Sequence, residues 1–130
     1  MKLIIILASM SRAGIDFFQS LLDRHSQISQ LPGKFFVDEF FLSIKNFESA
    51  EKIGEKFIDS HKEYFNSEIN LRERHNELGD NKNESFYVSE REFLKNFIQL
   101  LGKDTKDKKK IIFSINLDYS KASGEDISKK

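Results

Sequence analysis

The feature that most constrains the fold of this chain is an unbroken apolar run, LIIIL, at residues 3–7. A strand with one solvent-exposed face alternates apolar and polar residues, whereas a continuous apolar run is typical of a strand buried on both faces of a sheet. A segment of small residues follows at positions 8–14, and a helical stripe comes next, formed by Phe18, Leu21, Leu22 and His25. The pattern therefore predicts a central strand at residues 3–8, a tight loop and an amphipathic helix.

The loop between this strand and helix is predicted to bind an anion. The first N–H groups of a helix have no partner inside the helix, and the positive end of the helix dipole faces the same loop. The loop sequence SRAGID, residues 11–16, combines small residues with the guanidinium of Arg12. Phosphate or sulfate oxygens suit such a position, so we expect any anion captured by the chain to lie there.

The loop and the following helix resemble the 5′-phosphosulfate-binding region of the PAPS-dependent sulfotransferases. In that family a strand leads into a loop of the type Pro-Arg/Lys-Ser-Gly-Thr-Thr, and the next helix ends in Leu-Leu-Asp-x-His-Pro. In this chain residues 11–16 correspond to the loop, and LLDRHSQI, residues 21–28, corresponds to the helix end. Arg12 and Gly14 match the family pattern, and the helix end is the more specific part of the match.

The loop departs from the family pattern at three positions. Ser11 replaces the usual proline, and Ile15 and Asp16 replace the two hydroxyl residues that normally touch phosphate. A carboxylate at Asp16 interacts favourably with the helix dipole, but it repels a bound phosphate unless it is turned away, protonated or paired with Arg12.

The resemblance implies a fold, a co-substrate and a set of site residues. The fold is α/β, a P-loop-like three-layer sulfotransferase fold of which this chain carries the N-terminal part, one central strand followed mostly by helices. The co-substrate is PAPS (3′-phosphoadenosine 5′-phosphosulfate), without a metal, and the acceptor is a hydroxyl-bearing small molecule, saccharide or lipid. The residues that would bind the phosphosulfate are Ser11, Arg12, Ala13, Gly14, Ile15 and Asp16. Arg12 would also offset charge on the bridging oxygen, and Glu39 would take the proton of the acceptor hydroxyl.

The number of strands in the sequence limits how complete this domain can be. A chain of 130 residues normally forms one domain. A strand buried on both faces needs neighbours at both edges, yet residues 111–119 are the one further stretch with good strand character. We therefore expect residues 1–130 to form a single partial sulfotransferase-like domain, cut before the half that binds the 3′-phosphate. Such a chain would have little sulfotransferase activity and would self-associate through its unfinished sheet edge.

Composition excludes several other classes of function. Lys plus Arg equals Asp plus Glu at 21 each, so no global field favours nucleic acid or an anionic membrane. The chain has no Cys and no His-Glu-x-x-His motif, which leaves a zinc site unsupported. The apolar run is too short for a bilayer span or a signal peptide, and we expect a cytoplasmic protein.

The rest of the chain reads as helices. The turn signal Pro32-Gly33 precedes a first apolar stripe, formed by Phe36, Phe40, Ile44 and Phe47. A second stripe consists of Ala50, Ile53, Phe57 and His61. The sequence Ser89-Glu90-Arg91-Glu92 is a capping box that starts a further helix, and Gly102 is placed as its left-handed C-cap.

Residues 111–119 fit two patterns. Alternating apolar residues favour a half-buried strand, while Ile111, Ile115 and Tyr119 also share one side of a helix. We predict a helix here.

An alternative to the sulfotransferase interpretation is a non-catalytic remnant or binding module whose sheet another chain completes. A distant P-loop nucleotide-binding protein is a further alternative, although the Walker A motif is absent.

Overall fold

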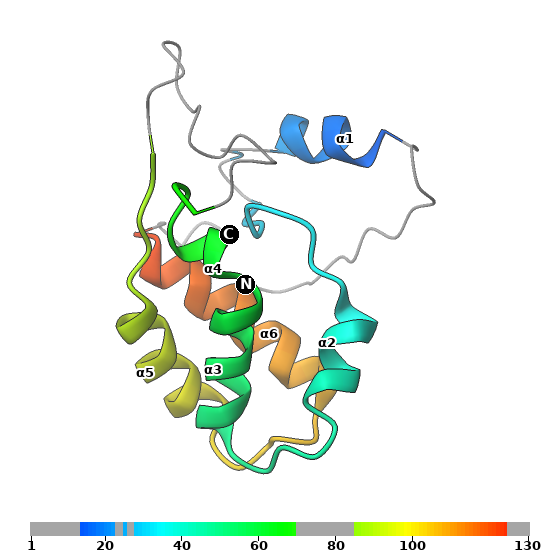
Figure 1. The fold of residues 1–130 in the computed structure, drawn as a ribbon, viewed down its shortest axis with the longest axis vertical. Helices are drawn as coiled ribbons and strands as arrows, with labels where there is room; N and C mark the ends of the chain where they lie inside the picture. The colour runs from blue at the N-terminus through cyan, green and yellow to red at the C-terminus, as the bar shows by residue number, and fades with distance from the viewer. Residues whose placement is uncertain (1–13, 23–24, 26–27, 70–84, 125–130) are drawn as a thin grey trace.

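The computed structural model of the protein describes residues 14–22, 25, 28–69 and 85–124, and this part of the chain is helical (Figure 1). The helices are α1 (Ile15–Leu22), α2 (Val37–Ser43), α3 (Ala50–Ser60), α4 (Lys62–Phe65), α5 (Glu90–Leu101) and α6 (Lys108–Ala122). Helix α5 packs against both α3 and α6. In Figure 1, α3 lies between α5 and α2, and α1 lies apart from the other helices.

The core is built from side chains at helical spacing on α3, α5 and α6. Helix α5 buries Phe93, Phe97 and Leu101, at intervals of four residues. These side chains meet the buried stripe of α3, which contains Ile53 and Phe57. Each helix therefore has one buried face, as expected for amphipathic helices packed around a shared core.

Phe57 is the ring around which the aromatic core is arranged. It is fully buried, and its ring centroid lies 5.4 Å from that of Phe93 on α5 and 5.9 Å from that of Phe40 on α2. Phe65, at the end of α4, lies 6.1 Å from Phe57 and 5.7 Å from Tyr119 on α6. One side chain of α3 thus links α2, α4 and α5 through ring contacts, in the range of separations that aromatic pairs favour.

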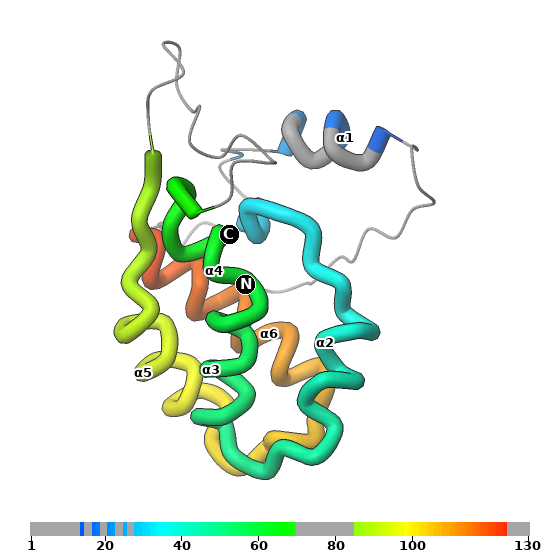
Figure 2. Tube along the Cα trace, viewed as in Figure 1, coloured from blue at the N-terminus to red at the C-terminus, as the bar shows by residue number. Residues whose placement is uncertain are grey.

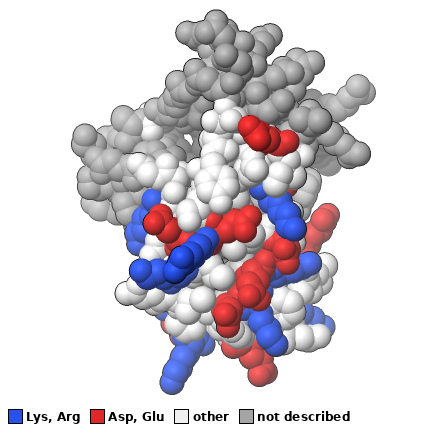
Figure 3. Space-filling model, turned by 60° about the vertical axis from the view of Figure 1, so that its left-hand side comes forward, with Lys and Arg blue, Asp and Glu red and all other residues white. Residues whose placement is uncertain are grey.

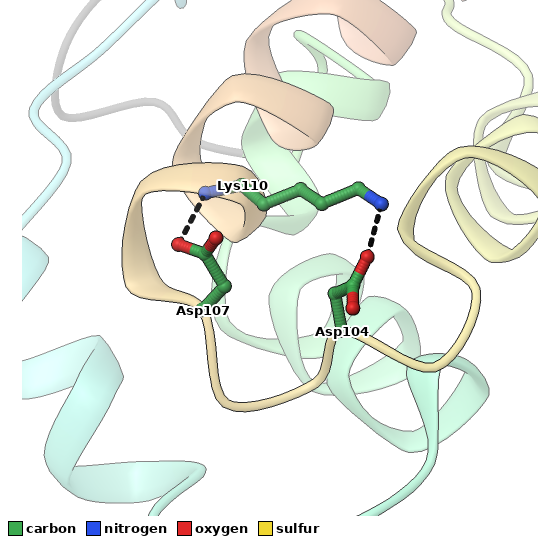
Figure 4. Close-up of polar contacts among 3 residues, drawn as sticks. All are labelled: Asp104, Asp107 and Lys110. Atoms are coloured by element: carbon green, nitrogen blue, oxygen red, sulfur yellow. Dashed lines mark hydrogen bonds and ion pairs between the residues drawn. The ribbon is translucent and has the colours of Figure 1, made fainter.

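Helix α6 begins at a cap formed by the preceding loop (Figure 4). The side chain of Asp107 accepts a hydrogen bond from the backbone N–H of Lys110 at 3.1 Å, and the ammonium of Lys110 pairs with Asp104. This cap satisfies one of the free N–H groups of the first turn. Figure 2 shows that this loop lies at the same end of the bundle as the α2–α3 connection, and Lys106 Nζ donates to the Phe47 carbonyl oxygen at 3.0 Å.

Two short segments on either side of residues 70–84 are held together by hydrogen bonds. Asn66 and Tyr87 form an isolated antiparallel bridge, the Val88 N–H donates to the Phe65 carbonyl at 2.8 Å, and the Phe86 N–H donates to Ser67 Oγ at 2.9 Å. Within the described residues this bridge is the one place where β-type pairing occurs.

The predicted α/β fold is wrong for the part of the chain that the structure describes. No sheet is present there, and the three-layer P-loop-like arrangement is absent. The reason is that the apolar faces of α3, α5 and α6 cover one another, so the core closes without a sheet. The predicted central strand at residues 3–8 lies outside the described residues.

Predictions from local sequence signals agree with the structure more closely than predictions that required a sheet. Ser89 caps α5 by accepting from the Glu92 N–H at 3.2 Å, and residues 111–119 are helical. Gly102 is the C-cap with the predicted positive φ of 59°, although its ψ of −121° lies outside the left-handed helical region. On α1, Phe18 and Leu21 of the predicted apolar stripe are exposed, so among the described residues this stripe does not join the core. Phe36 is also exposed, and Phe35 packs against Phe57 in its place.

Helices α3 and α5 pack closely at Gly54, and this contact provides a test of the packing. A Cβ at this position would lie 2.6 Å from Leu94 Cδ1 and 3.0 Å from Phe97 Cδ1. We expect Gly54→Val to lower the free energy of unfolding by about 2–3 kcal/mol, because overpacking forces the helices apart. Urea denaturation measures the change. Glu55→Val places the same side chain one residue along, at an exposed position, and should cost less than about 1 kcal/mol. Equal losses in the two variants would mean that α3 and α5 do not meet at Gly54.

Candidate functional site

The predicted phosphosulfate loop is described only at its end. Ser11, Arg12 and Ala13 lie outside the described residues. Gly14 is exposed with φ of 71°, a left-handed conformation that favours glycine, and α1 begins at the next residue, Ile15. The Phe18 N–H donates to the Gly14 carbonyl at 3.0 Å, which closes the first turn. The described part of the predicted site therefore consists of Gly14 and the start of α1, and the side chain of Asp16 is not described.

Glu39, the predicted base, lies in the first turn of α2 and is exposed. Its position near the N-terminal end of the helix suits a carboxylate. Its neighbour Asp38 is exposed as well. The described residues do not bring another titratable side chain into hydrogen-bond contact with Glu39.

His61 is a buried titratable group at the end of α3. The backbone N–H of His61 donates to the Ile58 carbonyl, so the Phe57 carbonyl lacks its usual helical partner, and His61 Nδ1 fills that place at 3.0 Å. A carbonyl oxygen can only accept, so Nδ1 carries the proton. The ring also stacks on Phe57, with centroids 4.7 Å apart. Desolvation lowers the pKa of His61 below 6.5, although the hydrogen bond to Phe57 and the Glu63 carboxylate oppose this shift.

Asp118 is a second buried titratable group, on the inner face of α6. Its side chain is fully buried, and its ion-pair partner is Lys121, with Nζ 3.6 Å from Oδ1. Among the described residues neither carboxylate oxygen has a hydrogen-bond partner, and Ser114 Oγ, one turn away on α6, has none either. Burial raises the pKa of Asp118 from 3.8 to about 6, against the attraction of Lys121.

The burial of Asp118 follows from a pattern in the sequence that the composition and motifs do not include. Counting from Ile111 and Ile115 in helical steps reaches residue 118 on the side of α6 that faces the core. An acid at such a position is desolvated, and its pKa rises. His61 belongs to the predicted stripe of α3, and its hydrogen bond to Phe57 indicates a structural role.

Two pockets open on the surface of the described helices. The α3–α5 pocket, of about 490 Å³, is lined by Glu55, Ile58, Asp59, Glu90, Arg91 and Leu94. The α2–α6 pocket, of about 480 Å³, is lined by Asp38, Phe41, Leu42, Ile44, Lys45, Thr105, Lys106, Lys108 and Ile111. Both acidic and basic side chains are present on the face seen in Figure 3. In contrast, the charged residues of the α2–α6 pocket are mainly lysines.

The described residues contain neither a metal-binding cluster nor a membrane-spanning helix. No group of three or more His, Asp or Glu side chains there is arranged to hold a metal ion. None of the helices in this range is both long and apolar enough to cross a membrane.

The two buried groups give opposite pH dependences, which can be separated. The pKa of Asp118 is raised on folding, so its contribution to stability is present below pH 3.8 and is lost, by about 3 kcal/mol, as the pH rises through 6. The pKa of His61 is lowered, so its contribution is lost as the pH falls below 6.5. We expect Asp118→Asn to raise the free energy of unfolding by about 1–3 kcal/mol at pH 7.5, and this gain should vanish near pH 4.

Urea denaturation between pH 4 and pH 8 measures this difference. Asp59→Asn, which removes an exposed carboxylate on α3, should change stability by less than about 0.5 kcal/mol at every pH. A gain for Asp118→Asn that does not depend on pH would contradict the raised pKa.

The chain was also compared with known proteins. No family model matches it, and neither the curated proteins nor the solved structures include a match. The resemblance to the sulfotransferases therefore rests on the residues of the N-terminal loop and helix themselves.

Proposed function

We propose that this chain is sulfotransferase-like and binds the phosphosulfate end of PAPS at residues 11–16, for transfer of the sulfuryl group to a hydroxyl acceptor. The observation that carries the proposal is the sequence of the loop and helix end, SRAGID followed by LLDRHSQI. The backbone at Gly14 supports it, since a glycine with positive φ directly precedes the start of α1, and a helix N-terminus is a favourable position for an anion. The proposed compartment is the cytoplasm.

In this proposal the guanidinium of Arg12 and the backbone N–H groups of the loop have different roles. The guanidinium of Arg12 binds the phosphosulfate and offsets the negative charge that grows on the bridging oxygen as the S–O bond breaks. The N–H groups from Ala13 to Ile15 contribute further hydrogen bonds at the start of α1. Glu39 accepts the proton of the acceptor hydroxyl as that oxygen attacks sulfur.

A second candidate is a helical binding module without catalytic activity. The observation that favours it is the closed aromatic core, in which Phe57, Phe93 and Phe97 pack between α3 and α5 without a sheet. A core of this kind can hold a recognition surface in place without PAPS. The two candidates differ in whether Arg12 contributes to nucleotide binding.

The first test is the affinity for adenosine 3′,5′-bisphosphate and for sulfate, measured by calorimetry on the full chain. We expect Arg12→Ala to weaken binding about ten- to a hundredfold, because a lost charge-assisted hydrogen bond costs roughly 1.5–3 kcal/mol. The matched control is Arg91→Ala, which removes an exposed arginine of α5 and should leave the affinity unchanged. Equal affinities for wild type and Arg12→Ala would favour the binding module.

The second test concerns Glu39 and uses radiolabelled PAPS with a panel of hydroxyl acceptors, because we expect slow turnover. Glu39→Gln should lower the rate of sulfation about hundredfold, as removal of a general base does, while the affinity for adenosine 3′,5′-bisphosphate stays constant. Glu51→Gln is the control, since Glu51 occupies the equivalent first turn of α3. A rate that Glu39→Gln leaves unchanged would remove Glu39 from the mechanism.

A further inference from the structure

The α2–α6 pocket has an apolar floor, and one of its apolar side chains, Leu42, is not covered by the helical core. Ile44 and Ile111, at the back of the pocket, are 5% and 1% exposed, and both belong to the core. Leu42 lines the same pocket but is 73% exposed, although Phe40 on α2 and Ile44 directly after α2 are buried. An apolar ligand group lying in this pocket would cover Leu42 and continue the surface formed by the two isoleucines.

The rim of the same pocket is basic. Lys45, Lys106 and Lys108 line it, against the single carboxylate of Asp38. Lys106 Nζ donates to a backbone carbonyl, and Lys108 Nζ lies 5.1 Å from the centre of the Phe41 ring. Among the described residues no carboxylate pairs with any of these three lysines, so the rim keeps an excess of positive charge.

Lys110, also on α6, differs from the lysines of the rim because it pairs with a carboxylate. The ammonium of Lys110 pairs with Asp104, and the start of α6 is already capped by the carboxylate of Asp107 (Figure 4). The helix end is therefore satisfied from within the chain. The positive charge available to a ligand comes from the lysines at the rim of the pocket rather than from the helix dipole.

We propose that the α2–α6 pocket binds a small amphipathic anion, a medium-length alkyl chain that ends in a carboxylate or sulfate. Exposed ion pairs contribute little on their own, so an inorganic anion would bind weakly at these lysines. An uncharged alkyl ligand would bury Leu42 but would not interact with the lysines of the rim. A ligand with both parts covers the apolar floor and places its charged end among Lys45, Lys106 and Lys108. This site is separate from the proposed PAPS loop and does not depend on it.

The test uses the full chain, labelled with ¹⁵N, and amide chemical shifts in a titration with octyl sulfate below its micelle concentration. We expect saturable shifts centred on Leu42, Thr105 and Lys106. Octanol and inorganic sulfate, which each carry one half of the chemistry, should bind at least tenfold more weakly. Octyltrimethylammonium reverses the charge and should not shift these amides. Equal binding of octanol, or octyl sulfate shifts confined to the exposed apolar residues of α1, would overturn the proposal.

Variants at the rim and floor provide the second measurement. Lys45→Gln and Lys108→Gln should each weaken octyl sulfate binding about three- to fivefold, the upper range for an exposed ion pair. Lys103→Gln removes an exposed lysine that does not line the pocket and should change the affinity by less than about twofold. Leu42→Ser should weaken octyl sulfate and leave sulfate unchanged. The proposal is wrong if Lys103→Gln has the same effect as the rim variants.

Discussion

The packing of rings around Phe57 is the interaction on which the rest of this structure depends. Its side chain is fully buried on α3, and its ring lies within 6 Å of Phe40 and Phe93, which come from helices far apart in the sequence. Ring pairs at these separations contribute beyond the area they bury, because edge and face have opposite partial charges. Phe40 and Ile44 anchor α2 to the core, and this contact fixes the position of the α2–α6 pocket.

This aromatic interior also determines the behaviour of the polar groups placed in it. A charged side chain loses its hydration when it is surrounded by rings and aliphatic groups, and its neutral form is then favoured. The imidazole of His61 stays neutral and uses its Nδ1–H to complete the end of α3. Asp118 pairs with Lys121, and burial raises its pKa toward neutrality. Both shifts follow from the packing and do not by themselves indicate catalysis.

The sequence predicted the helices where the signals were local. The Ser89 cap, the Gly102 terminus and the apolar spacing of Ile111 and Ile115 each depend on residues within one or two turns, and each is confirmed. The fold class was inferred from the buried run at residues 3–7, and burial of a strand depends on partners far away in the sequence. In the described residues the apolar faces of α3, α5 and α6 form the core instead. Local sequence patterns do not predict which helix faces pack against each other.

The candidate site was predictable to the same limited extent. Gly14 could be placed at a loop before a helix because glycine and the helical stripe are adjacent in the sequence, and the structure shows that turn. The meeting of Leu42 with Lys106 and Lys108 joins segments more than sixty residues apart, and it depends on how α2 and α6 cross the bundle. Charge and hydrophobicity along the chain do not indicate this pocket.

The bridge between Asn66 and Tyr87 has a consequence for how this protein can diverge. The hydrogen bonds around it, from Val88 to Phe65 and from Phe86 to Ser67, fix both ends of the intervening stretch to the core. Closing a longer loop between fixed ends costs only about 0.6 kcal/mol for each doubling of its length. Insertions and deletions between these two anchors should therefore accumulate in related sequences, while Phe65 and Val88 stay apolar.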